Sequence, residues 1–226
     1  MVRALAVAAA LAGGVLVAPA DAAPPAKACR LVRDAVGDTD SPMPDADLDR
    51  QLDITSADVA TGAKNLTVVL RLAALTAADP ANPQGRVYEF DFTAVEKNFI
   101  VMGSLLPGGN SFSVFISETR LEENESGARA ATGIGSAVGV VDVAKKEIRM
   151  TAPLSVFAPH APIGRKTPLV HLAAFTYRAN GYSAQPAHEM LPVEVEITGD
   201  VGLGVDQAWG RMAYYRAGTP SCVRAG

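Results

Sequence analysis

Eight aspartates and no glutamate lie between residues 34 and 58, and they form the densest group of potential metal ligands in the chain. Short carboxylates on loops can converge on a hard cation, and calcium takes six to eight oxygen ligands at about 2.3 to 2.6 Å. The spacing does not match an EF-hand loop, so the signal is compositional. Two interpretations stay open: a calcium site, or a solvated loop whose aspartates cap turns. For a calcium site, the predicted ligands are Asp34, Asp38, Asp40 and Asp53.

Other groups give weaker indications of chemistry. Glu89 and Asp91 lie two residues apart, so one face of a strand would carry both. Such a carboxylate pair could serve a glycosidase, although outward-facing strand charges explain it more simply. The glycines between 133 and 139 have the wrong spacing for a nucleophile elbow and are interpreted as loop or bulge glycines. No histidine pair has metal-ligand spacing, and His171 is predicted to be a hydrogen-bonded structural residue.

Sugar binding would need aromatic platforms, and aromatic residues make up only 6% of the chain. The single tryptophan, Trp209, is more typical of a core or terminal packing residue, since indole buries a large apolar area.

Short segments of alternating polarity must position these groups. Residues 66–72 and 88–93 alternate with a period of two, which predicts strands with Leu66, Leu70 and the aromatic Tyr88 and Phe90 facing inward. Polar and glycine-containing turns at 95–98, 107–110 and 144–146 predict three hairpins. Further strands are expected at 169–177 and 193–197, one turn of helix at 154–158, and a mobile loop at 122–135.

Many short strands separated by turns predict an all-β fold, specifically an antiparallel β-sandwich with at most one or two short helices. A jelly roll and an immunoglobulin-like arrangement are the alternatives. We see no linker that would divide residues 23–226, so they are expected to form one domain.

The N-terminus predicts export. Arg3 precedes an apolar run from Ala4 to Ala18, and small residues follow, which is typical of a signal peptide covering residues 1–22. No later apolar run is long enough to span a membrane, so release into the periplasm or medium is expected after cleavage. In an oxidising compartment, Cys29 and Cys222 are predicted to form a disulfide.

The net charge of −4 argues against nucleic acid as a partner. The alanine-rich leader and the excess of arginine over lysine are typical of a bacterial protein.

Four short segments carry a resemblance to a known group of domains. An Asp-rich Gly-Asp segment at 34–38 is followed by an Asp-Ile segment at 53–59 and by residues 64–68, and residues 147–155 match a strand followed by Pro-Leu. In these features the chain resembles the carbohydrate-binding family 9-like and DOMON-like secreted β-sandwich domains. The resemblance implies a β-sandwich that binds a sugar, haem or calcium, or that has no known ligand. The paired tryptophans of a family 9 sugar site are not present.

The sequence thus predicts a secreted, non-catalytic binding or structural module that calcium could stabilise, with an unknown extracellular ligand or protein as partner. The alternative is a secreted hydrolase of the glycosidase type that uses paired carboxylates.

Overall fold

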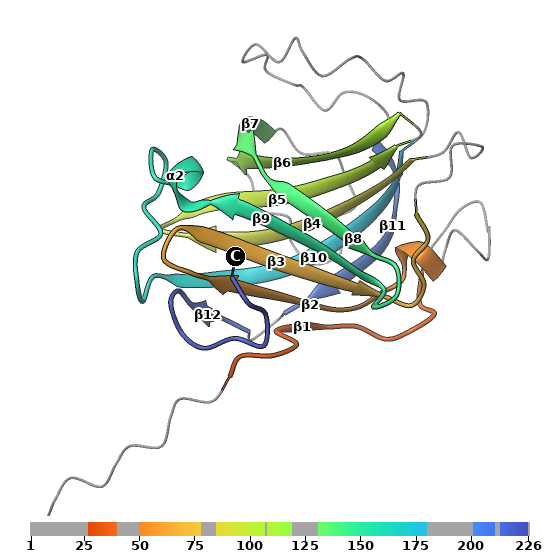
Figure 1. Ribbon diagram of the computed structural model, residues 1–226, viewed down its shortest axis with the longest axis horizontal. Coiled ribbons are helices and arrows are strands. Elements are labelled where there is room, and N and C mark those ends of the chain that lie inside the picture. Colours follow the sequence, from red (N-terminus) through yellow and green to blue (C-terminus); the bar gives the residue numbers. More distant parts are fainter. Residues whose placement is uncertain are drawn as a thin grey trace, which may run out of the picture.

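The computed structural model describes residues 27–39, 50–77, 85–106, 108–118, 131–179, 201–210 and 213–225. They form two antiparallel sheets that pack face to face as a β-sandwich (Figure 1). The five-stranded sheet has the order β1 (Val32–Arg33), β2 (Ile54–Thr61), β3 (Asn65–Leu72), β9 (Glu147–Pro153), β8 (Val138–Asp142). The seven-stranded sheet has the order β11 (Val201–Trp209), β10 (Pro168–Ala179), β4 (Gly85–Ala94), β5 (Lys97–Leu106), β6 (Gly109–Ser117), β7 (Ala131–Ser136), and β12 (Tyr215–Arg216) pairs with β10. The predicted fold class is confirmed.

The inner faces of the two sheets share one hydrophobic core. Leu66, Leu70, Tyr88 and Phe90 are fully buried in it, as the alternation predicts. Phe157 of the short helix α2 (Leu154–Phe157) closes one end of this core and packs edge-on against Phe99, with ring centroids 5.2 Å apart. The single helical turn expected at 154–158 is therefore confirmed, and residues 50–52 are helical as well.

The three predicted hairpins are all present. Strands β4 and β5 pair Ala94 with Lys97, so Val95 and Glu96 form a two-residue turn, both with positive φ (48° and 61°). Two consecutive positive φ values define the type I′ turn, whose twist matches that of the flanking strands. The second hairpin joins β5 to β6, and the third joins β8 to β9 through residues 143–146.

One predicted loop is partly wrong. Residues 131–136 form strand β7, which pairs with β6, whereas the sequence favoured a loop over 122–135. The glycines of this region lie in strands. Gly133 and Gly135 flank a register shift in the β6–β7 pairing, which agrees with the predicted bulge glycines. Neighbouring side chains also occupy the space that a Cβ on Gly135 or Gly139 would need. A Cβ on Gly139 would lie 2.1 Å from the Phe112 ring, and one on Gly135 would lie 2.7 Å from Val156. Side chains of neighbouring elements pack onto these glycines, so the strands here lack the alternation of polar and apolar side chains that marks the other strands.

Several predictions fall on residues outside the described part of the chain: the signal peptide at 1–22, the strand at 193–197 and residues 122–130 of the loop. Strand β10 confirms the strand expected at 169–177. Strand β11 was not predicted, because glycines at 202 and 204 interrupt its apolar pattern.

Candidate metal centre

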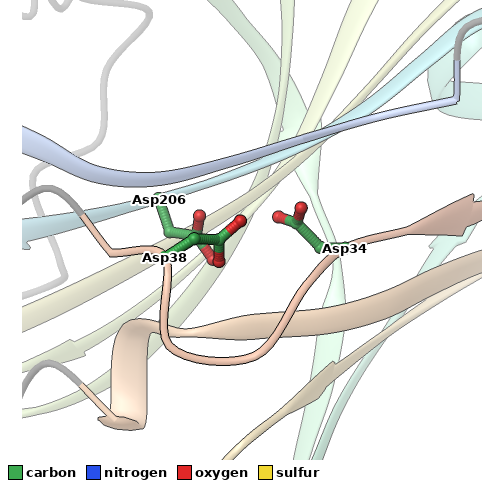
Figure 2. Close-up of side chains that lie close together, drawn as sticks. All are labelled: Asp34, Asp38 and Asp206. Atoms are coloured by element: carbon green, nitrogen blue, oxygen red, sulfur yellow. The ribbon is translucent and has the colours of Figure 1, made fainter.

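Three aspartates from two distant segments meet at one end of the sandwich. Asp34 and Asp38 lie in the loop that follows β1, and Asp206 lies on β11 (Figure 2). One carboxylate oxygen from each of the three lies within 4.8 Å of the others. Two oxygens on opposite sides of a calcium ion are about 4.8 Å apart, so this spacing is compatible with three ligands of a single calcium ion.

Residues Asp53 and Ile54 fix both sides of this arrangement. The loop turns at Gly37, whose φ of +87° favours glycine, and the Gly37 N–H donates to Asp53 Oδ2 at 2.8 Å. On the other side, the Ile54 N–H donates to Asp206 Oδ2 at 2.6 Å. Two neighbouring residues at the start of β2 therefore place the loop and the strand that carry the acidic cluster, which we define as Asp34, Asp38, Asp53 and Asp206.

The electrostatics of the cluster are unfavourable for a set of ionised carboxylates. Burial, followed by the negative charge of Asp38, raises the pKa of Asp34 to about 6, although the Ala35 N–H bond opposes this shift. The pKa of Asp53 is also raised, mainly by burial and further by the charge of Asp38. The Gly37 N–H bond and the charge of Arg50 oppose this rise. Asp34 Oδ2 and Asp53 Oδ1 are buried without a hydrogen-bond partner. A cation held between these oxygens would offset that cost.

The predicted ligand set is only partly reproduced. Asp34 and Asp38 lie together, Asp53 lies beside them through its bond to Gly37, and Asp40 is outside the described residues. Sequence reasoning missed Asp206, because it lies in a glycine-containing strand, separated by 152 residues from Ile54 at the start of β2. An acid on the strand that neighbours the loop in space has no signature in a single sequence.

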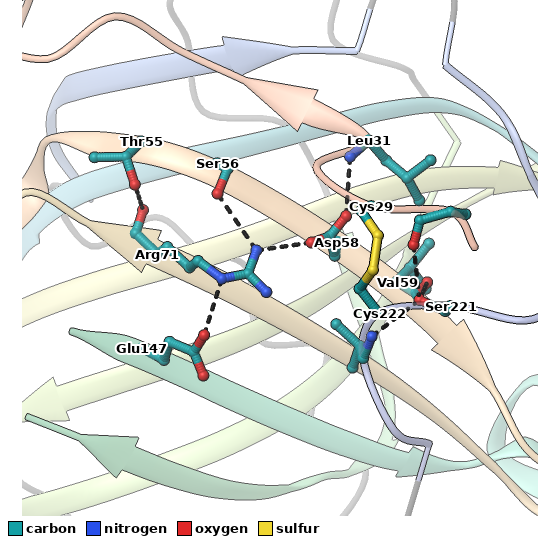
Figure 3. Close-up of polar contacts among 12 residues, drawn as sticks. Cys29, Leu31, Thr55, Ser56, Asp58, Val59, Arg71, Glu147, Ser221 and Cys222 are labelled. Atoms are coloured by element: carbon teal, nitrogen blue, oxygen red, sulfur yellow. Dashed lines mark hydrogen bonds and ion pairs between the residues drawn. A yellow bond between two sulfur atoms is a disulfide. The ribbon is translucent and has the colours of Figure 1, made fainter. Parts of the chain in front are cut away.

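Asp58, from the same acidic run, has a different role. Its side chain is fully buried, and its Oδ2 lies 2.7 Å from Arg71 Nη1 while its Oδ1 accepts from the Leu31 N–H at 2.9 Å (Figure 3). Arg71 Nε in turn donates to Glu147 Oε1 at 2.9 Å. Burial alone would lower the pKa of Arg71, but the bonds to Asp58 and Glu147 raise it. This carboxylate is fully compensated by protein groups.

The predicted disulfide is confirmed. Cys29 and Cys222 are joined, with their Cα atoms 5.3 Å apart, within the usual range for this bond. Next to it, the Cys222 N–H donates to the Ala28 carbonyl at 3.0 Å, and the Ser221 hydroxyl donates to Val59 at 3.3 Å (Figure 3). The two ends of the described chain are therefore fastened to each other and to the outer face of the five-stranded sheet.

The remaining candidate residues do not join the acidic cluster. Glu89 and Asp91 lie on the outer face of β4, as expected, but they are only 7% and 8% exposed. A cavity beside Asp91 has a volume of about 10 Å³, enough for one water molecule.

His171 is hydrogen-bonded as predicted, with Nδ1 3.2 Å from Thr93 Oγ1, yet it is exposed and has a φ of +51°. Trp209 lies in β11, and its side chain is outside the description.

Comparisons with models of known protein families, with curated proteins and with solved structures found no match. Among the described residues, no helix is long and apolar enough to cross a membrane. The disulfide is compatible with an extracellular protein.

Proposed function

We propose that the protein is a secreted, non-catalytic binding or structural module that holds a calcium ion at the acidic cluster. The observation that carries the proposal is the convergence of Asp34, Asp38 and Asp206 within 4.8 Å, beside buried carboxylate oxygens of Asp34 and Asp53 that lack a hydrogen-bond partner. The Asp-rich opening of the resembled sandwich domains falls on the same loop. The cation would join the loop after β1 to strand β11, so its role would be to stabilise the fold.

Calcium suits this cluster better than magnesium. The ligands come from a loop and a strand at uneven spacing, and calcium tolerates six to eight oxygens in flexible geometry, whereas magnesium demands a tight octahedron at 2.0 to 2.1 Å. Extracellular calcium modules commonly bind with a Kd of about 10⁻⁴ to 10⁻³ M, which a partly exposed loop can reach. We therefore expect millimolar calcium to stabilise the protein by about 1 to 2 kcal/mol.

Thermal unfolding of chelator-treated protein, with and without millimolar calcium, tests the proposal. We expect a rise in Tm of about 2 to 6 °C with calcium and a smaller rise with magnesium. Asp34→Asn and Asp206→Asn should each remove most of the rise. Asp142→Asn is the matched control, because Asp142 is an exposed carboxylate that pairs with Lys145 in the β8–β9 turn. An absent rise, or a rise that survives in both cluster variants, would refute the site.

A further inference from the structure

A second site lies at the opposite end of the sandwich. A cleft of about 440 Å³ is lined by residues that include Thr61, Gly62, Leu154, Ile163, Arg165 and Gly218. Asp53 comes just before β2 and Thr61 ends it, so an eight-residue strand, roughly 25 Å long, separates the cleft from the acidic cluster. The lining residues come in part from α2 and from the turn after β12, and Figure 1 shows these two elements at the same end of the sandwich. The two sites are therefore separated by the length of this strand.

Hydrogen bonds hold the walls of the cleft in place. The Gly218 N–H donates to Thr61 Oγ1 at 2.6 Å, which ties the turn after β12 to the end of β2. The Leu154 N–H donates to the Lys64 carbonyl, and the Lys166 N–H donates to the Ala217 carbonyl, both at 2.7 Å. Because these turns are already fixed to one another, a ligand would enter a formed cavity and lose little affinity to ordering of the protein.

Arg165 supplies the charge of the cleft. Gly218 has a φ of +77°, and a Cβ at this position would lie 3.1 Å from Arg165 Cγ, so the arginine stem packs over a turn that needs glycine. The side chain is exposed, and its guanidinium forms no ion pair with any other described residue. An arginine anchored by its stem, with a free guanidinium at a cavity wall, presents a fixed set of hydrogen-bond donors.

The surroundings of the cleft are positive although the chain is acidic. Lys64, Lys166 and Arg216 are exposed beside it, and the segments 59–67, 152–169 and 214–223, which line and flank the cleft, contain neither aspartate nor glutamate. In a chain of net charge −4, the immediate surroundings of the cleft are therefore basic, and the acid of the β4–β5 turn, Glu96, lies on a separate turn at this end. A positive potential around a cleft raises the local concentration of anions.

We propose that this cleft binds a small organic carboxylate, with its carboxylate on the Arg165 guanidinium and its apolar body against Leu154 and Ile163. The planar guanidinium matches a carboxylate through two parallel hydrogen bonds. A phosphate site would favour several free backbone amides, but those of Gly62, Gly164 and Gly218 already donate to Asn65, Thr167 and Thr61. No aromatic residue lines the cleft, which argues against a sugar ring.

Isothermal titration calorimetry with 3-phenylpropionate and hexanoate tests the proposal, with the corresponding amides and inorganic phosphate as comparison ligands. We expect both carboxylates to bind with a Kd below the millimolar range, and the amides and phosphate to bind at least about tenfold more weakly. Arg165→Ala should weaken carboxylate binding by about tenfold to a hundredfold. Arg33→Ala is the control, since Arg33 is an exposed arginine on β1, away from the cleft.

Both variants should keep the wild-type Tm, which separates loss of binding from loss of folding. Carboxylate binding that is equal in Arg165→Ala and Arg33→Ala would overturn the proposal, as would absent binding at millimolar carboxylate. Equal affinity for phosphate and carboxylate would overturn the assignment of the ligand class. Calcium is omitted from these titrations, so that their result does not depend on the acidic cluster.

Discussion

The fold treats two carboxylates from the same acidic run in opposite ways: Asp58, which is fully buried, and Asp34, which is half-buried. Asp58 faces the outside of the five-stranded sheet, where Arg71 and the Leu31 N–H satisfy both of its oxygens. Asp34 faces Asp38 and Asp206 at the edge of the sandwich, and its Oδ2 is buried without a hydrogen-bond partner. One site is complete in the protein alone, whereas the other gathers negative charge that an external cation could balance.

The contrast between Asp58 and Asp34 shows that the aspartates of one acidic run can have different roles. A buried charge with a partner is mainly a structural element, because removal of the partner leaves it uncompensated. A group of like charges with raised pKa values is a candidate for ligand binding. Mutations should therefore affect the two sites differently, in size and in sign.

The largest effect is expected from the disulfide that covers the Asp58 site. Replacement of both cysteines, Cys29→Ser with Cys222→Ser, frees a loop with a sequence separation of 193 and should lower the free energy of unfolding by up to about 5 kcal/mol. Leu31 lies two residues after Cys29, and its N–H donates to Asp58. Without the disulfide, this hydrogen bond should therefore be lost before the rest of the sheet unfolds. Chemical denaturation measures the loss. An unchanged midpoint would show that the clasp does not stabilise the fold.

Removal of the arginine at the Asp58 site should have the next largest effect. Arg71→Ala leaves Asp58, which is fully buried, without its cation, and we expect a loss of about 3 kcal/mol. We choose the lower end of the usual range because the Arg71 side chain is 25% exposed. Lys145→Ala, which breaks the exposed pair with Asp142, should change stability far less. The calcium response should survive in both variants, and its loss in Arg71→Ala would show that the two sites are coupled.

The smallest effect, with the opposite sign, is expected at Asp34. In chelator at pH 7.5, Asp34→Asn should stabilise the protein by about 1 kcal/mol, because it removes a carboxylate whose pKa of about 6 in the folded protein exceeds the ordinary value of 3.8. Because the folded state favours the protonated form of Asp34, this group stabilises the fold below pH 3.8, and the stabilisation is lost as the pH rises through about 6. The difference between variant and wild type should therefore vanish as pH falls from 7.5 to 4. Denaturation in chelator across this range provides the measurement, and a difference that does not change with pH would contradict the assignment.

The sequence predicted the fold better than the site. Alternation in residues 66–72 and 88–93 reports directly which side chains face the core, and turn residues mark where strands reverse. Strand β7 escaped prediction because glycines at 133 and 135 interrupt its alternation, and the packing of Gly135 against Val156 is a contact that no local pattern records.

The acidic cluster was half predicted for a related reason. Asp34 and Asp38 are close in sequence, but Asp206 joins them only because β11 lies beside the loop after β1, which depends on sheet order. The cleft beside Arg165 was not predicted at all, since three separate turns and α2 form it and each turn contributes only two or three residues. The sequence gives the residue types of both sites, but it does not show which residues distant in sequence the sheet order brings together.

The Cys29–Cys222 bridge also decides how the domain would respond to a pulling force. A force applied at the two ends of the described chain reaches this covalent bond before it reaches any hydrogen bond between strands. The strands enclosed between the two cysteines would carry no load while the bond is intact. Reduction of the bond would transfer the tension to β1 and β12, two-residue strands that could separate one hydrogen bond at a time. The clasp thus makes the mechanical strength of the domain depend on the redox state of its surroundings.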